Sequence, residues 1–279
     1  MPQNPLNLPH RENRTTFTMS DGKISLTWLG QMGLLIKTDS TSLCVDYFAS
    51  PMEGRLIAPP FPAGGLKGID AFVGTHDHID HIDHDAWKIW AKNNPDAKFI
   101  FPRKHMESVL RDGITKENAT GLNDGESYQI GDVTIHAIPA SHEFLDRDES
   151  GLYPYLQYVI EAGGIRIHHA GDTVRYEGML GKIKQFGKID VQMLPINGRD
   201  AKRYRQNWIG NMTFQEAADL AGDVMPSLVI PGHWDMFEIN GEDPVLFADY
   251  IDAKYGKKIE CRIPKIMEEI IIEKRNGNG

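Results

Sequence analysis

The sequence predicts a protein of the α/β (α+β) class in which two β-sheets lie between two layers of helices. Three observations lead to this prediction. Short apolar runs typical of strands gather in two groups, one before residue 75 and one after residue 126. Runs with helical apolar spacing alternate with further strands, and 279 residues are enough to bury a large core. Because each sheet must bury an apolar face, this arrangement favours a four-layer αββα sandwich.

The individual elements are expected where the apolar period changes between two and about 3.6 residues. Strands are expected at 24–28, 33–38, 42–47, 70–74, 99–101, 127–130, 133–138, 155–161, 165–169, 191–196 and 228–230. Helices are expected at 85–93, 105–112 and 213–223. The stretch 50–68 is rich in proline and glycine and is expected to be a loop. Thr213, followed by Glu216 three residues later, has the pattern of a capping box and predicts where the last of these helices begins.

The composition limits the classes of function. Residues 1–22 offer little to bury and are expected to form an N-terminal arm, with 23–279 as a single domain. No apolar run reaches the roughly 18 residues that cross a bilayer, so we expect neither a signal peptide nor a membrane span. A formal net charge of −9 argues against a nucleic-acid partner. Two distant cysteines, Cys44 and Cys261, favour a reducing cytoplasm. A homo-oligomer is left open.

The densest chemical signal is the segment Thr-His-Asp-His-Ile-Asp-His at 75–81, directly after an expected strand. Imidazoles and carboxylates are ligands for Zn²⁺, Mn²⁺ or Fe²⁺. A strand that ends in a tight loop can direct His76 and His78 at one point while Asp80 and His81 reach a second. The alternative is a solvated polar loop. Since the whole chain has only 11 histidines, we favour a metal site over a chance cluster.

Three other expected strands also end beside a side chain that can bind metal. His142 follows the strand 133–138, Asp172 follows 165–169, and His233 follows 228–230. Each position alone is weak, because a single histidine after a strand is more often a hydrogen-bonded structural residue. Together with the first cluster, in this order, they indicate one metal site with contributions from four strands.

The string His-x-His-x-Asp-His, followed by isolated His, Asp and His, resembles the metallo-β-lactamase-fold hydrolase superfamily over about residues 24–264. The resemblance implies an αββα sandwich with the site at one edge between the sheets. It also implies two metal positions. The first would be held by His76, His78 and His142, the second by Asp80, His81 and His233, with Asp172 as the bridge.

Further segments are similar to the branch of that superfamily that contains L-ascorbate 6-phosphate lactonase. They include Trp-Leu-Gly-Gln-Met-Gly at 28–33, Gly-Asn-Met-Thr at 210–213 and Pro-Gly-His-Trp-Asp at 231–235. The resemblance therefore implies a metal-dependent lactone or ester hydrolase. One or two divalent ions are expected, most simply Zn²⁺ or Mn²⁺, with Fe²⁺ as a third choice.

The expected mechanism follows from the ligand set. A bound divalent cation lowers the pKa of water from about 15.7 toward 7, which makes hydroxide available at neutral pH. Asp80 is expected to act as a catalytic residue that orients the water or carries its proton, besides ligating. Asp46 and His169 are expected to lie behind the site and to orient ligand imidazoles by hydrogen bonds.

Substrate selection is expected in the segment after the strand 191–196, which gathers four cations in an acidic protein. Guanidinium groups suit carboxylate or phosphate oxygens, so we expect a small anionic substrate such as a phosphorylated sugar lactone. A solvated basic turn paired with surface carboxylates is the equal alternative. The residues concerned are Asn197, Arg199, Lys202, Arg203 and Arg205.

Two other functions use the same ligands. A phosphodiesterase or phospholipase-like hydrolase is the second hypothesis, because phosphate groups also suit the basic segment. A metal sensor or di-iron redox protein is the third. That function requires a flavin domain or another electron donor, and the sequence offers no segment for either.

Overall fold

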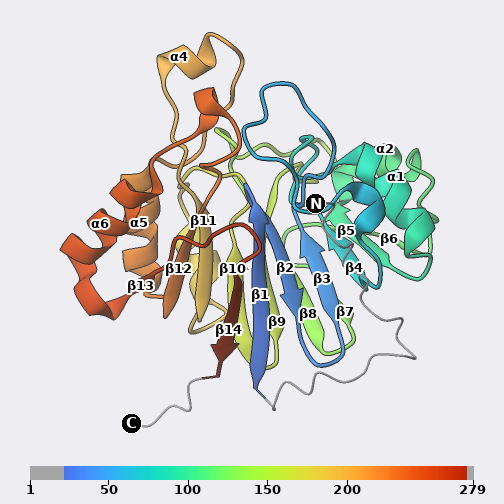
Figure 1. Cartoon of the computed structure of the whole chain (residues 1–279), viewed down its shortest axis with the longest axis horizontal. Helices are drawn as coiled ribbons and strands as arrows, with labels where there is room; N and C mark the ends of the chain where they lie inside the picture. The colour runs from blue at the N-terminus through green and yellow to red at the C-terminus, as the bar shows by residue number, and fades with distance from the viewer. Residues whose placement is uncertain (1–21, 275–279) are drawn as a thin grey trace.

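The structure is a computed structural model that describes residues 22–274, so the expected N-terminal arm lies outside the described residues except for Gly22. The described chain forms two seven-stranded sheets and six α-helices (Figure 1). The strands are β1 (Lys23–Gly30), β2 (Gly33–Lys37), β3 (Ser42–Val45), β4 (Ala71–Val73), β5 (Lys98–Pro102), β6 (Ala119–Leu122), β7 (Ser127–Ile130), β8 (Val133–Pro139), β9 (Leu156–Ala162), β10 (Ile165–His169), β11 (Val191–Pro195), β12 (Leu228–Gly232), β13 (Glu260–Cys261) and β14 (Glu269–Glu273). The helices are α1 (His84–Asn93), α2 (Met106–Leu110), α3 (Met179–Lys184), α4 (Ala201–Tyr204), α5 (Phe214–Val224) and α6 (Pro244–Tyr255).

Each sheet combines an antiparallel and a parallel part. The first has the order β14-β1-β2-β3-β4-β5-β6, and the second has the order β13-β12-β11-β10-β9-β8-β7. In the first sheet the pairs from β3 to β6 are parallel, and in the second the pairs from β10 to β13 are parallel. The parallel strands of each sheet therefore end at a common edge, and this is where loops that carry function gather in such sheets.

The expected αββα sandwich is confirmed by the layers. Side chains alternate along the strands, so Leu34 and Ile36 of β2 belong to the apolar cluster between the sheets, whereas Leu35 belongs to the cluster beneath α1. A third cluster lies between the second sheet and the helices α3, α5 and α6. Figure 1 shows α5 and α6 on one side of the sheets and α1 and α2 on the other.

Several element boundaries follow from local chemistry. The capping box is confirmed, because the Thr213 hydroxyl accepts the Glu216 N–H and the Glu216 carboxylate accepts the Thr213 N–H. The strands β6, β13 and β14 and the helices α3, α4 and α6 were not expected, and α4 lies in the segment after residue 196 that was expected to be a loop. β14 has apolar residues on both faces and no alternation, and it pairs with β1 from the opposite end of the described chain.

None of the described helices has the length and apolar character that a membrane span requires.

Candidate metal centre

The seven side chains expected to bind metal lie on loops that follow four strands. The loop after β4 of the first sheet carries four of them, and the loops after β8, β10 and β12 of the second sheet carry one each. These three strands run in one direction, since β8 and β10 are both antiparallel to β9 and the pairs from β10 to β12 are parallel. Their ends meet the end of β4 between the sheets. The residues are His76, His78, Asp80, His81, His142, Asp172 and His233.

The structure brings the ligand atoms of these side chains together in three groups. Within each group, the atoms lie within 4.8 Å of one another. The groups are His76, His78 and His142; His76, His81 and Asp172; and Asp80, His81 and His233. The first and third groups correspond to the two ligand sets that the resemblance implies, and the second group connects them.

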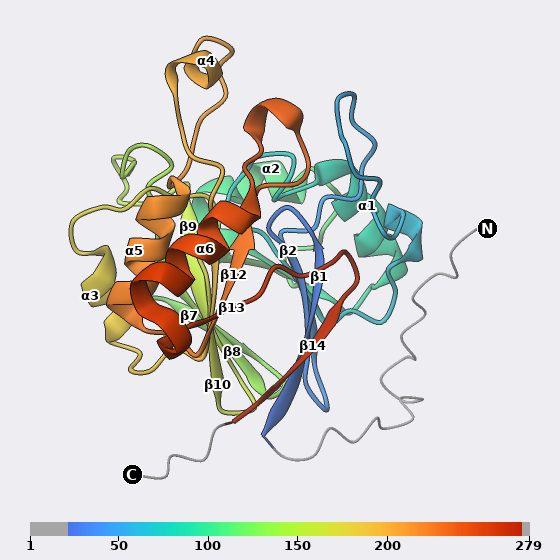
Figure 2. The same ribbon diagram turned by 60° about the vertical axis from the view of Figure 1, so that its left-hand side comes forward.

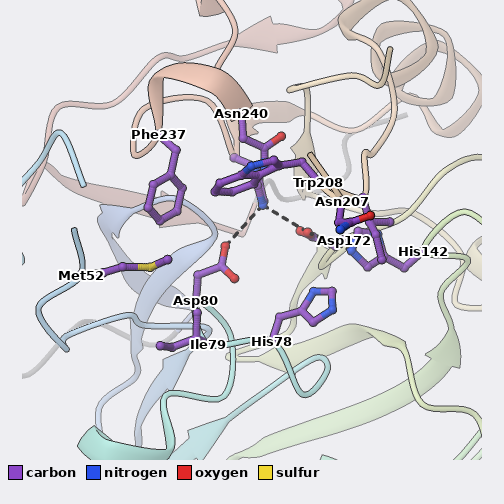
Figure 3. A pocket seen from close by; sticks show the side chains of 12 residues that line it. Met52, His78, Ile79, Asp80, His142, Asp172, Asn207, Trp208, Phe237 and Asn240 are labelled. Atoms are coloured by element: carbon purple, nitrogen blue, oxygen red, sulfur yellow. Dashed lines mark ion pairs between the residues drawn. The ribbon is translucent and has the colours of Figure 1, made fainter. Parts of the chain in front are cut away.

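The carboxylate of Asp172 lies between the two outer groups. Its Oδ1 is 3.3 Å from Nε2 of His81. Its Oδ2 is 3.1 Å from Nε2 of His233 and 3.7 Å from Nε2 of His142. The dashed lines in Figure 3 mark the ion pairs of His233 with Asp172 and Asp80. Oδ2 thus faces one imidazole of the first group and one of the third, Oδ1 faces a second imidazole of the third group, and the carboxylate lies beside both groups.

The donor set fits one or two divalent cations. Nε2 of His81 and Oδ1 of Asp172 are buried, and neither makes a hydrogen bond to any residue that the structure describes. Buried polar atoms are normally paired, so these two atoms fit a site at which they would ligate a cation. Imidazole and carboxylate donors without a thiolate suit Zn²⁺, Mn²⁺ and Fe²⁺.

The imidazoles of the site are of two kinds, those whose pKa is lowered by burial and those whose pKa is raised by the neighbouring carboxylates. Burial holds the pKa of His76 well below its usual value and lowers the pKa of His142 to about 4. Burial also opposes protonation of His233, but the charges of Asp172 and Asp80 outweigh it and raise the pKa to about 9. Imidazoles of the first kind are neutral at pH 7, which is the state that binds a metal. An imidazole of the second kind is protonated at pH 7, and a metal ion that binds it would take the place of this proton.

A buried carboxylate behind the site holds the imidazole of His81. Oδ2 of Asp46 lies 2.7 Å from Nδ1 of His81 and accepts the Thr75 hydroxyl, while Oδ1 accepts the Thr75 N–H at 2.8 Å. Such a contact fixes the orientation of a ligand imidazole and increases its basicity. His169 lies behind Asp46. Its Nε2 donates to the carbonyl of Met32 at 2.8 Å, and its Nδ1 is 4.0 Å from Oδ2 of Asp46.

Gln31, for which the sequence predicted no role, lies inside the site. Its Nε2 donates to Oδ2 of Asp80 at 2.9 Å and lies 3.2 Å from Nε2 of His233. Its own N–H donates to the Asp235 carboxylate, and its φ of 53° places it in the tight turn between β1 and β2. The one sequence signal for this residue is the Gly-Gln-Met-Gly turn between two expected strands.

A cavity of about 220 Å³ opens at this group of side chains. Its metal-binding side is formed by His78, Asp80, His142, Asp172 and His233. The remaining lining comprises Met52, Ile79, Asn207, Trp208, Ile209, Phe237 and Asn240 (Figure 3). The volume is below the roughly 300–1,000 Å³ of pockets for drug-sized ligands, so the cavity fits a small substrate or the reacting part of a larger one.

Two of the cations expected to bind substrate are engaged elsewhere. Arg199 donates to both carboxylate oxygens of Glu216, at 2.6 and 2.8 Å. Arg203 donates to the backbone carbonyls of Ile239 and Gly241 at 3.0 and 2.9 Å. Neither residue lines the cavity. Their guanidinium groups hold the segment after β11 against its neighbours, a role that the sequence could not separate from substrate binding.

The other three residues expected to bind the substrate also lie outside the cavity lining; they are Asn197, Lys202 and Arg205. Lys202 and Arg205 are exposed, the first within α4 and the second directly after it. Figure 2 shows α4 projecting beyond the ends of the strands. Asn197 is fully buried and bonded to two other asparagines. The segment instead contributes Asn207, Trp208 and Ile209 to the cavity.

Comparison with known proteins agrees with this geometry. The beta-lactamase superfamily domain matches residues 43–234 of the chain. The chain belongs to the beta-lactamase superfamily. Its relatives include a UPF0173 metal-dependent hydrolase of Anaeromyxobacter dehalogenans, which is 30% identical over 87% of this chain and 84% of its own length. The protein is accordingly a metal-dependent hydrolase of the beta-lactamase superfamily.

Two further proteins extend the comparison. A Salmonella paratyphi B protein named probable L-ascorbate-6-phosphate lactonase UlaG is 25% identical, over 86% of this chain and 79% of its own. The solved structure of Igni18, a metallo hydrolase from Ignicoccus hospitalis, superposes with a TM-score of 0.71 at 22% identity. That superposition covers 91% of this chain and 100% of the other, and it agrees with the αββα fold.

Proposed function

We propose that this hydrolase cleaves the lactone or ester bond of a small substrate. The observation that carries the proposal is the convergence of seven imidazole and carboxylate side chains, five of which line one side of a cavity of about 220 Å³. A cavity of this size holds a reacting acyl group and its leaving oxygen. The 25% identity to a protein named as a lactonase supports this kind of bond.

Within this proposal, the three histidines His76, His78 and His142 hold one divalent cation. Asp80, His81 and His233 hold the second, and Asp172 contacts both. When bound, a divalent cation lowers the pKa of a water molecule and polarises the oxygen of the bond under attack. Zn²⁺, Mn²⁺ and Fe²⁺ all suit these donors, and occupancy depends on their availability.

Asp80 is proposed as the residue that handles the proton. Its Oδ2 accepts from Gln31 and faces His233 at 3.5 Å, whereas its Oδ1 makes no hydrogen bond to any described residue. The side chain is 14% exposed and lines the cavity. In hydrolysis, Oδ1 accepts the proton that the attacking water loses and returns it to the leaving oxygen when the acyl C–O bond breaks.

The charge of the substrate is the second part of the proposal. The cavity lining includes no lysine or arginine from the described residues, so an anionic group of the substrate would have to reach a cation beyond the lining. A phosphorylated sugar lactone remains the proposed substrate type. Comparison of its kcat/KM with that of an uncharged lactone measures how much the negative charge contributes.

The first experiment combines elemental analysis with a substrate panel. Metal content is measured for the purified protein and for His142→Ala. The panel contains a phosphorylated sugar lactone, the uncharged lactone dihydrocoumarin and the phosphodiester bis-p-nitrophenyl phosphate. We expect the bound metal to fall in the variant, together with lactone turnover. Turnover of the phosphodiester alone would reject lactone hydrolysis in favour of phosphodiester hydrolysis, and the absence of any metal-stimulated activity would reject both.

A further inference from the structure

Three buried asparagines from separate segments form a hydrogen-bonded chain that ends at the cavity. Nδ2 of Asn211 donates to Oδ1 of Asn197 at 3.0 Å, and Nδ2 of Asn197 donates to Oδ1 of Asn240 at 2.8 Å. Asn197 and Asn211 are fully buried, and Asn240 is 5% exposed. Asn197 lies two residues after β11, and Asn211 lies shortly before α5. Asn240 is the last residue of a short 3₁₀ helix (Glu238–Asn240) after β12. Only Asn240 lines the cavity.

The order of donors in this chain determines what Asn240 presents to the cavity. A side-chain amide has an acceptor oxygen and a donor NH₂ group. The oxygen of Asn240 is occupied by Asn197, and its Nδ2 donates to no residue in the described part of the chain. Asn240 lines the cavity, and its Nδ2 is not one of the fully buried polar atoms without a partner, so this group faces the open volume of the cavity. The free N–H groups of Asn240 are therefore available to a group inside the cavity.

The rest of the lining makes this donor distinctive. Asp80 and Asp172 are acceptors, the three lining imidazoles belong to the metal centre, and the other wall is mostly apolar. Asn207 and Trp208 also carry neutral N–H donors, but Asn207 lies exposed on the segment after α4 and Trp208 is only half-buried beside it. Asn240 is thus a neutral donor held in a fixed orientation, and its complement is an uncharged or partly charged oxygen acceptor.

We propose that Nδ2 of Asn240 donates a hydrogen bond to an oxygen of the substrate, and that Asn197 and Asn211 are positioning residues that fix its amide. The inference rests on the proposed function only for the identity of the bond that is cleaved. A carbonyl, ester or phosphoryl oxygen satisfies the same donor. Sites that donate hydrogen bonds to a substrate select strongly for the group that accepts them.

The substitution Asn240→Asp isolates this contact. It preserves size and keeps an acceptor for Nδ2 of Asn197, while it replaces the donor with a carboxylate that repels a substrate oxygen. We expect kcat/KM for dihydrocoumarin to fall at least tenfold, with metal content and unfolding midpoint close to those of the parent. Asn197→Asp, which removes the donor that orients Asn240, is expected to give a smaller loss. Asn118→Asp, at a position whose side chain contacts Pro95 and Lys98 instead, is the matched control.

A second measurement does not depend on turnover. The side-chain NH₂ signals of Asn240, assigned by their loss in Asn240→Asp, are followed by ¹H–¹⁵N NMR during addition of the ring-opened product of dihydrocoumarin to the metal-loaded protein. A selective shift supports the contact. Binding of the product without such a shift, or kcat/KM within twofold of the parent in the folded variant, overturns it. If only bis-p-nitrophenyl phosphate is hydrolysed, lactone hydrolysis is rejected while the same variants test Asn240 on the phosphodiester.

Discussion

The guanidinium of Arg199 donates to both carboxylate oxygens of Glu216, and its Nη1 also reaches the backbone carbonyl of Asn211. Glu216 in turn completes the capping box of α5. A cation that the sequence offers for substrate binding is therefore part of the connection between the segment after β11 and the start of α5. Its removal is expected to affect stability more than substrate affinity.

The first prediction concerns this contact. Arg199→Ala is expected to lower the free energy of unfolding by about 1 kcal/mol, because it removes a partly exposed bidentate ion pair and one hydrogen bond. KM is expected to stay within twofold of the parent value. Urea unfolding and steady-state kinetics measure the two quantities. Arg175→Ala removes a single-nitrogen contact with Asp223 at the surface and is the control. A large rise in KM with unchanged stability would contradict this view of Arg199.

The second prediction concerns the carboxylate behind His81. Asp46→Asn keeps the size of the side chain but removes the charge next to Nδ1 of His81. Loss of such an outer contact weakens metal binding by about 10- to 100-fold, and we expect a change in that range. Competition with a metal chelator measures the affinity. Asp132→Asn serves as control, because this carboxylate lies at the end of β8 opposite to His142 and accepts three hydroxyl groups there. Equal affinities in both variants would refute the role of Asp46.

The third prediction concerns pH and the first residue of α1. Hydrogen bonds with Asp112 and Asp77 raise the pKa of His84 from 6.5 to about 9. Lys88 and His105 also face these carboxylates. Since the folded value exceeds the unfolded one, the stabilisation is complete below pH 6.5 and disappears as pH rises through 9.

Urea unfolding at pH 6, 7.5 and 10 tests this prediction. His84→Gln is expected to be less stable than the parent at pH 6 and to approach it at pH 10. Asp112→Asn should reduce the pH dependence of the parent, because it removes the partner with the largest effect on the pKa of His84. A stability difference that is constant across this range would show that protonation of His84 does not contribute.

The fourth prediction concerns removal of the metal. Ligand loops from both sheets meet at the site, so a cation that binds only the folded chain stabilises the packing of one sheet against the other. At a free concentration 100 times the Kd, one bound ion stabilises the folded state by about 2.7 kcal/mol. Chelation with EDTA is expected to lower Tm. The Tm of Asp172→Ala should respond much less, and an equal response would place the stabilising ion elsewhere.

The sequence predicted much of the fold, because alternating apolar residues mark strands and the capping box marks the start of α5. It also predicted which side chains converge at the site, since each follows an expected strand. The five residues expected to bind the substrate illustrate what sequence leaves open. A guanidinium pattern does not reveal whether a partner such as Glu216 lies within reach.

Gln31 and Asn240 were missed for a different reason. A neutral amide has no charge, no metal preference and no periodicity that would distinguish it from a surface residue. Gln31 acquires its role through a turn with φ of 53°, and Asn240 through two other buried asparagines. Both relationships depend on contacts between segments far apart in the chain, which a single sequence does not report.

The pairing of β1 with β14 has a consequence for the synthesis of the chain. Residues 23–30 leave the ribosome early, but their partner, residues 269–273, follows all seven proposed ligands. A nascent chain that already contains His233 therefore still has β1 as an uncovered outer strand, able to pair with another chain. Completion of β14 covers that strand and leaves an outer strand with Glu269 and Glu273 at its two ends. Only a chain in which β14 has paired with β1 is thus protected from association through its first described strand.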